Sequence, residues 1–241
     1  MTRFRIATYN VHKCRGVDWR LNPQRVSDVI RECAPDILAV QEILYSQAEA
    51  ISTSLQLPFT FGAARQHAGE PYGNAVFTRL SVTSSESHDI TVPMREPRQC
   101  LRVSVTLPNR APLHFFALHL GTSFFERRAQ GRRVVSVEIL EHPDLKNARI
   151  VAGDFNEWTR GLATRMLSRH LQSADIAMHL KRRRTYPGVF PLAHLDHVYY
   201  DAAFHLREMH LHRSRHALVA SDHLPLIADF EAAGADGPCQ S

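Results

Sequence analysis

Residues 151–157 read Val-Ala-Gly-Asp-Phe-Asn-Glu, and this stretch decides the fold. An apolar run that begins at Ile150 stops at Gly153, and two hydrogen-bonding side chains, Asp154 and Asn156, follow. If the run is a buried strand, their spacing places both side chains on one face, just past the strand end, where ligands of α/β sheets bind. A carboxylate that takes a proton and an amide that holds an oxygen suit the activation of water at a phosphate. An Asx-rich turn that satisfies only local backbone groups is the alternative for this stretch alone.

The same event recurs along the chain: an apolar, strand-like run ends at a carboxylate, an amide or an imidazole. If these strands share a sheet edge, their polar ends converge, and no single stretch has to carry the prediction. The polar residues concerned are Asn10, Glu42, Asn74, His119, Asp154, Asn156, Asp196, Asp222 and His223.

The order of elements indicates an α/β fold. Strand 3–10, a helix capped by Asn22 with Pro23 at its first position, and strand 36–40 make a βαβ unit. Further helices are predicted at 47–57, 126–140 and 162–171, and further strands at 75–78, 81–92, 101–107, 112–119, 149–153, 195–200 and 224–230. Because no linker divides the chain, we predict one domain over residues 1–231 and a disordered tail over 232–241.

Composition limits the class of protein. The 241 residues are 44% hydrophobic and 22% charged, with a formal net charge of +5, which favours anionic partners. No apolar run approaches the roughly 18 residues of a membrane span, and the N-terminus enters a strand pattern at once. We therefore expect a cytoplasmic monomer, with transient contact to a membrane surface left open. The four cysteines are scattered and are expected to be reduced.

A divalent cation is expected where the carboxylates meet. Several carboxylates in one cleft repel each other, which raises their pKa values unless a cation is present. Oxygen ligands such as Glu42 and Asn10 favour Mg²⁺, with Mn²⁺ as a possible substitute. His119 and His223 leave a catalytic zinc site as a remote alternative.

Seven motifs occur in a fixed order and point to one family. Together they resemble the endonuclease/exonuclease/phosphatase superfamily of DNase I-like, metal-dependent phosphoesterases, over residues 3 to 231, and small bacterial members in particular. The motifs are Thr8-Tyr9-Asn10-Val11-His12, Asp36-Ile37-Leu38-Ala39-Val40-Gln41-Glu42, Tyr72-Gly73-Asn74-Ala75-Val76, Ala117-Leu118-His119-Leu120, Gly153-Asp154-Phe155-Asn156, Leu195-Asp196-His197-Val198 and Ser221-Asp222-His223-Leu224-Pro225.

The resemblance implies a four-layered α/β sandwich: two packed mixed β-sheets flanked by helices, with the catalytic site at one end. It also implies the metal ligands. The residue matching Glu42 is the principal magnesium ligand in such enzymes, and those matching Asn10 and Asp222 assist it. The number of metal ions is left open.

The resemblance further assigns catalytic roles. Asp154 would orient or deprotonate the attacking water, and Asn156 would hold a phosphate oxygen. The pair matching Asp196 and His223 would stabilise the transition state, with the imidazole donating to a non-bridging oxygen. His119 occupies a position assigned to leaving-group protonation or phosphate binding.

Substrate-binding residues are harder to assign. Tyr72 and Asn74 match a loop that flanks the substrate in relatives. Arg98 lies where relatives often place an arginine that faces phosphate, with a solvated loop charge as the alternative. By strand alternation, Gln41 and His197 point away from the site, so Gln41 is expected to support the neighbouring Glu42 without touching a ligand, and His197 is expected to be structural.

Two other features have plain alternatives. The run Lys181 to Arg184 could track a phosphate backbone, or it could be a solvated charged face. The histidines at 205, 210, 212 and 216 could bind a metal, but solvated histidines are the simpler interpretation.

The substrate itself is open at this stage. The first hypothesis is a phosphodiesterase that acts on nucleic acid, either DNA or RNA. The second is a phosphatase or esterase acting on a phospholipid headgroup, an inositol phosphate or a nucleotide. A catalytically inactive binding module is the alternative from another class.

Overall fold

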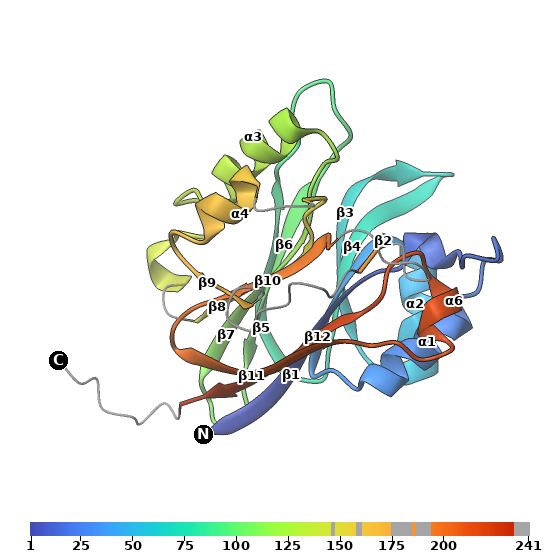
Figure 1. Cartoon of the computed structure of the whole chain (residues 1–241), viewed down its shortest axis with the longest axis horizontal. Helices are drawn as coiled ribbons and strands as arrows, with labels where there is room; N and C mark the ends of the chain where they lie inside the picture. Colours follow the sequence, from blue (N-terminus) through green and yellow to red (C-terminus); the bar gives the residue numbers. More distant parts are fainter. Residues whose placement is uncertain (146–147, 158–160, 175–184, 187–193, 234–241) are drawn as a thin grey trace.

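The computed structural model describes residues 1–145, 148–157, 161–174, 185–186 and 194–233. These residues form two six-stranded sheets, with the orders β11-β12-β1-β2-β4-β3 and β5-β6-β7-β8-β10-β9 (Figure 1). The first sheet contains β1 (Thr2–Asn10), β2 (Ile37–Leu44), β3 (Phe59–His67), β4 (Glu70–Thr78), β11 (Phe204–Leu211) and β12 (Leu226–Ala232). The second contains β5 (Ser81–Asp89), β6 (Gln99–Thr106), β7 (Pro112–His119), β8 (Arg149–Asp154), β9 (Gln172–Ser173) and β10 (Asp196–Tyr200).

Both sheets are mixed, and each has one parallel pair near its centre. In the first sheet β1 runs parallel to β2, and in the second β7 runs parallel to β8. These four strands also face one another across the sandwich, since β1 and β2 contact β8 and β2 contacts β7. Parallel neighbours bring their carboxyl ends to the same edge, so four strand ends meet at one end of the molecule.

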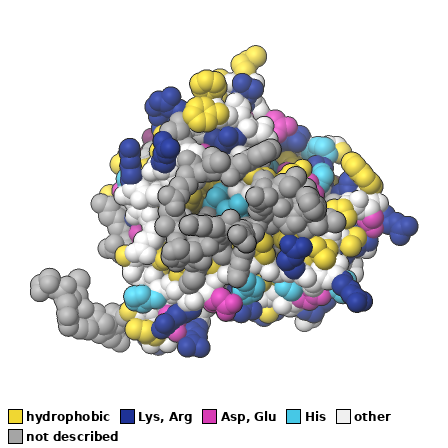
Figure 2. Space-filling model, in the orientation of Figure 1, with side chains coloured by type: hydrophobic (Ala, Val, Ile, Leu, Met, Phe, Trp, Pro, Cys, Tyr) yellow, Lys and Arg dark blue, Asp and Glu magenta, His cyan; other side chains and the backbone are white. Residues whose placement is uncertain are grey.

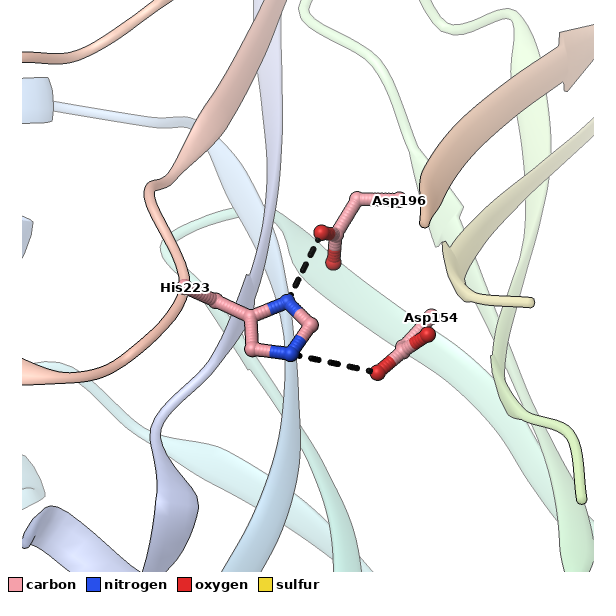
Figure 3. Close-up of side chains that lie close together, drawn as sticks. All are labelled: Asp154, Asp196 and His223. Carbon is pink, nitrogen blue, oxygen red and sulfur yellow. Dashed lines mark hydrogen bonds and ion pairs between the residues drawn. The ribbon is translucent and has the colours of Figure 1, made fainter. Parts of the chain in front are cut away.

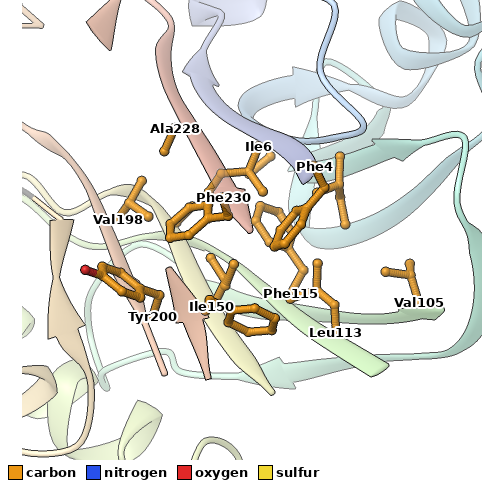
Figure 4. Close-up of a cluster of buried hydrophobic side chains, with 14 of the residues drawn as sticks. Phe4, Ile6, Val105, Leu113, Phe115, Ile150, Val198, Tyr200, Ala228 and Phe230 are labelled. Atoms are coloured by element: carbon orange, nitrogen blue, oxygen red, sulfur yellow. The ribbon is translucent and has the colours of Figure 1, made fainter. Parts of the chain in front are cut away.

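The two sheets pack through an apolar core of aromatic and β-branched side chains (Figure 4). Phe4 of β1 stacks on Phe230 of β12 with ring centroids 5.7 Å apart. Phe115 of β7 and Ile150 of β8 face them from the second sheet and are fully buried. Because the strands alternate, the opposite face of each sheet must be covered by another layer.

Helices provide that cover. An apolar cluster that includes residues of α1 (Pro23–Cys33), α2 (Tyr45–Leu55) and α6 (Ala217–Ala220) covers the first sheet. A second cluster joins α3 (Phe124–Val134) and α4 (Leu162–Leu167) to the second sheet. The four layers confirm the predicted sandwich (Figure 1). The Asn22 side chain accepts a hydrogen bond from the Arg25 N–H at 3.0 Å, as an N-cap should.

Several predicted elements differ in extent. The helix predicted at 126–140 ends at Val134, and turns follow, since the β-branched pair Val134-Val135 gives little helical support. The helix predicted at 162–171 ends at Leu167. Ala232, assigned to the tail, is the last residue of β12, while 234–241 lie outside the described residues. Two short 3₁₀ helices, η1 (His12–Cys14) and η2 (Pro143–Leu145), complete the described elements.

Strands β3 and β11 have no counterpart in the sequence prediction. Both are edge strands, and both carry many polar or charged side chains that hide the period-2 apolar pattern. Among the described helices, none combines the length and the apolar character that a membrane span requires.

Gly153 sets how closely β7 and β8 approach at the strand ends. A Cβ atom on this residue would lie 2.0 Å from the carbonyl oxygen of Leu118 in β7. We expect Gly153→Ala to push the two strands apart and to lower the free energy of unfolding by about 1–3 kcal/mol. Urea denaturation of both proteins measures the change. An unchanged midpoint would show that the strand pair tolerates the methyl group.

Candidate active site

Four strand ends meet across the two sheets. From the first sheet, Asn10 ends β1 and Glu42 lies near the end of β2. From the second sheet, His119 ends β7 and Asp154 ends β8. The Asn10 amide donates to Glu42 Oε1 at 3.2 Å and to Asp154 Oδ2 at 3.0 Å, which joins the sheets directly.

A histidine bridges two carboxylates at the centre of this group (Figure 3). His223 lies in the loop between α6 and β12. Its Nδ1 is 2.9 Å from Asp196 Oδ2, and its Nε2 is 3.7 Å from Asp154 Oδ2. Burial alone would lower the pKa of His223, but Asp196 and Asp154 raise it to about 10. The imidazole therefore carries a positive charge at neutral pH.

Asp154 is buried and shared among several donors. Burial, together with the charge of Asp196, raises the pKa of Asp154 to about 6, although His223 and the Asn10 amide oppose the shift. The carboxylate is thus ionised at neutral pH but close to its titration range. That balance suits a group that has to accept a proton.

Asn156 does not share a strand face with Asp154. Strand β8 ends at Asp154, and Asn156 has a left-handed backbone with φ 50°. Its N–H donates to Asp154 Oδ1 at 2.8 Å, and its side chain donates to the Leu120 carbonyl at 2.8 Å. The geometric argument from strand alternation was therefore wrong. The Asx turn weighed as the alternative is present, and it coexists with the contacts of Asp154 Oδ2.

Glu42 is aimed by a β-bulge. The pairing of β2 with β4 shifts between Val40 and Ile43, and Glu42 has φ 55°. Burial alone would raise the pKa of Glu42, but His119, the Asn10 amide and Lys13 hold it at about 2. Lys13 Nζ lies 3.6 Å from Glu42 Oε2.

His119 lies between the two sheets' carboxylates. Its Nε2 is 3.8 Å from both Glu42 Oε1 and Asp154 Oδ2. Burial, with Arg98 nearby, nevertheless lowers the pKa of His119 to about 3. The ring is therefore neutral at neutral pH, where Asn10 and Lys13 carry the stabilisation of Glu42. A neutral imidazole suits phosphate binding better than leaving-group protonation.

Asp222 lies at the rim and is matched by His12. His12 Nδ1 is 3.3 Å from Asp222 Oδ2, and this hydrogen bond raises the pKa of His12. Burial alone would raise the pKa of Asp222, but the contact with His12 lowers it. The Ser221 hydroxyl donates to the Asn10 carbonyl at 2.8 Å and so ties this loop to the end of β1.

Three residues near the site were given no role by sequence reasoning. His12 and Lys13 follow Asn10 by two and three positions, so extending the strand-end rule past the first polar residue would have found them. Tyr186, whose ring centroid is 4.9 Å from that of His223, comes from a loop that carries no such signal.

The predicted substrate-binding residues line one small recess beside His119. Tyr72, Asn74 and Arg98 line this recess together with Gln99. The Asn74 amide donates to the Gln99 carbonyl at 3.5 Å, and Arg98 pairs with Glu96 at 3.1 Å. On the face of the molecule that Figure 2 shows, histidine side chains are visible near the middle, and many Lys and Arg side chains lie toward the edge.

The residues predicted to hold a metal form a set with oxygen donors. Burial alone would raise the pKa values of Glu42 and Asp222, but their neighbours lower both, and the side chains of Lys13 and His12 contact the two carboxylates. Asn10 now turns its NH₂ group toward the carboxylates, and its Oδ1 accepts from the His12 N–H at 3.0 Å. Turning the amide over would present Oδ1, so the donor set fits a hard divalent ion.

A second group of possible ligands lies deeper. The ligand atoms of Asp154, Asp196 and His223 all lie within 4.8 Å of one another. The charges of Asp196 and Asp154 favour the protonated form of the His223 ring, however, whereas a metal-bound imidazole must be neutral. Glu42, Asp222 and Asn10 therefore remain the predicted metal ligands.

The remaining predicted residues lie elsewhere. Gln41 is buried and bonds to the Thr8 hydroxyl at 3.1 Å, and buried His197 contacts the Glu157 carbonyl at 3.3 Å. His212 and His216 both pair with Glu32, at 2.8 and 2.7 Å. Lys181 to Arg184 fall outside the described residues.

Two packed mixed sheets with carboxylates and imidazoles gathered at one end define a phosphoesterase of the DNase I-like class. The chain belongs to the Endonuclease/Exonuclease/phosphatase family, whose sequence profile matches residues 7–223.

The chain is also similar to individual proteins over nearly its whole length. The uncharacterized protein YbhP of Escherichia coli K12 is 28% identical over 248 residues, which cover 94% of this chain and 96% of YbhP. Mannosyl-6-phosphatase Bt3783 of Bacteroides thetaiotaomicron superposes with a TM-score of 0.77 at 18% identity, covering 95% of this chain and 99% of that one. D. rerio TDP2, solved with a single-strand DNA product, gives 0.75 at 15% identity, covering 96% and 100%.

Asp196 should control the charge of His223. In Asp196→Asn the imidazole loses its hydrogen-bonded carboxylate, and burial then opposes protonation with less compensation. We expect the pKa of His223 to fall strongly, so that the ring loses its charge at a lower pH than in the wild type. Nitrogen-15 NMR of the His223 ring in EDTA reports this titration. A midpoint as alkaline as in the wild type would exclude Asp196 as the cause.

Proposed function

We propose that this chain is a divalent-metal-dependent phosphoesterase that hydrolyses a phosphodiester by in-line attack of water, with nucleic acid as its substrate. The observation that carries the proposal is the environment of one oxygen atom. Asp154 Oδ2 lies within 3.0 Å of an amide nitrogen and within 3.8 Å of two imidazole nitrogens, one of them charged.

Asp154 is the proposed base. The attacking water gives its proton to this carboxylate while its oxygen bonds to phosphorus, and the bond to the leaving oxygen breaks on the opposite side. A pKa of about 6 keeps Asp154 able to accept that proton at neutral pH.

His223 and Asn156 are the proposed donors to the phosphate. The charged imidazole of His223 offers Nε2–H where negative charge develops on the non-bridging oxygens, while Asp196 fixes the ring by holding Nδ1. One N–H of the Asn156 amide holds the Leu120 carbonyl, and the second is available for a phosphate oxygen. His119 is a neutral donor to the same group.

Glu42, Asp222 and Asn10 are the proposed ligands of Mg²⁺, with Mn²⁺ as a substitute. When bound, the ion neutralises charge on the phosphate and on the leaving oxygen. The paired side chains Lys13 and His12 balance the two carboxylates without it.

Nucleic acid is the proposed substrate on two grounds. The chain has a formal net charge of +5, which favours a polyanion. D. rerio TDP2, whose fold this chain shares over 96% of its length, was solved with a single-strand DNA product.

A phosphomonoesterase is the second candidate. The similarly close superposition with Bt3783, a mannosyl-6-phosphatase, favours it. A nuclease would also bind a flanking phosphate of its substrate, whereas a phosphomonoesterase would bind the cleaved phosphate and its leaving group.

Asp154→Ala tests the chemistry. Purified wild type should nick plasmid DNA and cleave bis(p-nitrophenyl) phosphate with Mg²⁺ or Mn²⁺ but not with EDTA. The variant should lose at least about 10³-fold in kcat, because it loses the base. Circular dichroism checks its fold, and Asp144→Ala, which removes an exposed carboxylate, is the matched control.

Each pattern of activity decides between functions. Diester cleavage with intact plasmid would favour a small substrate, and activity on a monoester panel alone would favour the phosphatase. No hydrolysis of any phosphate ester would favour the inactive binding module.

Glu42→Ala tests the metal site. We expect little activity at low Mg²⁺ and partial recovery at high Mg²⁺, since Asn10 and Asp222 remain. The measurement is the Mg²⁺ concentration that gives half-maximal hydrolysis of bis(p-nitrophenyl) phosphate. An unchanged requirement would remove Glu42 from the metal site, and Glu49→Ala on the exposed side of α2 controls for the lost charge.

A further inference from the structure

Two arginines beside the candidate site carry donors that the described residues leave unused. The Nε–H groups of Arg65 and Arg98 are buried and have no hydrogen-bond partner among those residues. A buried, charged donor without an acceptor is costly, so these nitrogens point to a ligand. Arg102 and Arg127 share the feature, but they are engaged elsewhere, with Glu86 and with backbone carbonyls of 121–122.

One exposed carboxylate bridges the two arginines. Glu96, whose side chain is 61% exposed, lies 3.1 Å from Arg98 Nη2 and 3.9 Å from Arg65 Nη2. Glu96 is the exposed partner of both ion pairs, so its carboxylate can move into solvent and an incoming anion can replace it. Arg98 itself is almost completely buried and cannot turn away into solvent.

The Tyr72 ring holds Arg65 and Lys13 next to the reactive groups. Arg65 and Tyr72 are cross-strand partners just after a bulge in β3, and the guanidinium carbon lies 4.7 Å from the ring centroid. Lys13 Nζ lies 5.9 Å from the same centroid and also contacts Glu42. Such cation–π contacts hold positive groups at set positions. The positive side chains of Lys13, Arg65 and Arg98 thus lie between the carboxylates of Glu42 and Glu96.

We propose that Arg65, Arg98 and Lys13 form a subsite for a second, non-scissile phosphate of the substrate. This proposal rests on the proposed function, because that reaction supplies the neighbouring, scissile phosphate. Binding at the subsite itself needs no metal ion. Guanidinium groups bind phosphate oxygens through parallel, charge-assisted hydrogen bonds. The substrate class is therefore a phosphoester with a further phosphate beside the one that is cleaved, as in an oligonucleotide or a nucleoside bisphosphate.

Binding by the full chain in EDTA tests the subsite without catalysis. Isothermal titration calorimetry compares thymidine 3′,5′-bisphosphate with thymidine 5′-monophosphate. We expect the bisphosphate to bind about 10- to 100-fold more tightly, the scale of one or two charge-assisted hydrogen bonds. Arg65→Gln should reduce this preference to about threefold or less, whereas Arg31→Gln, an exposed arginine on α1, should keep it.

Glu96→Gln separates a ligand site from a purely structural ion pair. Removing the internal anion should tighten binding of the bisphosphate by about three- to tenfold, because the arginines no longer have to release Glu96. If Glu96 only holds the two arginines in place, binding will be unchanged or weaker. Equal affinity for both probes, no binding of either, or equal losses in Arg65→Gln would overturn the subsite.

The length of the nucleotide probe shows whether the second phosphate belongs to a polynucleotide or to a small molecule. A thymidine trinucleotide with a 5′-phosphate that binds more tightly than the bisphosphate indicates a polynucleotide, and equal binding indicates a small bisphosphate. Both outcomes support the subsite. Metal-dependent hydrolysis of bis(p-nitrophenyl) phosphate without a bisphosphate preference would reject the subsite alone. A preference without any hydrolysis would reject the proposed reaction and keep the subsite.

Discussion

The repulsion among four carboxylates at one end of the sandwich is the constraint on which the site depends. Burial makes an ionised carboxylate expensive, and a second negative charge nearby adds to that expense. Three of the carboxylates have a basic partner: Lys13 for Glu42, His12 for Asp222 and His223 for Asp196. Asp154 has the least favourable balance, and it is the carboxylate whose pKa is raised toward neutrality. The electrostatic repulsion at the site is therefore least compensated at Asp154.

The residue patterns were sufficient to predict an α/β fold with polar groups at its strand ends, and the family resemblance supplied the four layers. Buried central strands appear as continuous apolar runs, so the residue that ends each run, such as Asn10 or His119, is easy to locate. Parallel pairing then requires β1 with β2 and β7 with β8 to end on the same edge. The family motifs added that strand ends of both sheets meet at one site, which the periodicity of the sequence cannot show.

What could not be predicted depends on local backbone geometry and on edge strands. The bulge that aims Glu42 requires a left-handed residue at a position where the sequence has no glycine. The turn at Asn156 breaks the alternation that a strand would impose. Arg65 lies on the edge strand β3, whose polar residues mask its period, so a cation beside Tyr72 remained invisible until β3 was paired with β4. Tertiary pairing decides the bulge and the place of Arg65, whereas the turn at Asn156 is the Asx turn that the residue types had offered as the alternative.

The turn after β1 shows how the fold holds such geometry in place. His12, Lys13 and Cys14 have φ values of 46°, 55° and 54°, a left-handed run that costs about 1–2 kcal/mol per residue. The surroundings oppose relaxation: Cys14 is fully buried, and the Gln47 amide donates to the Lys13 carbonyl at 2.7 Å. An extended continuation of β1 would send side chains 12 and 13 to opposite faces. The left-handed turn instead directs His12 to Asp222 and Lys13 to Glu42, so conformational strain in three residues is exchanged for electrostatic compensation of two carboxylates.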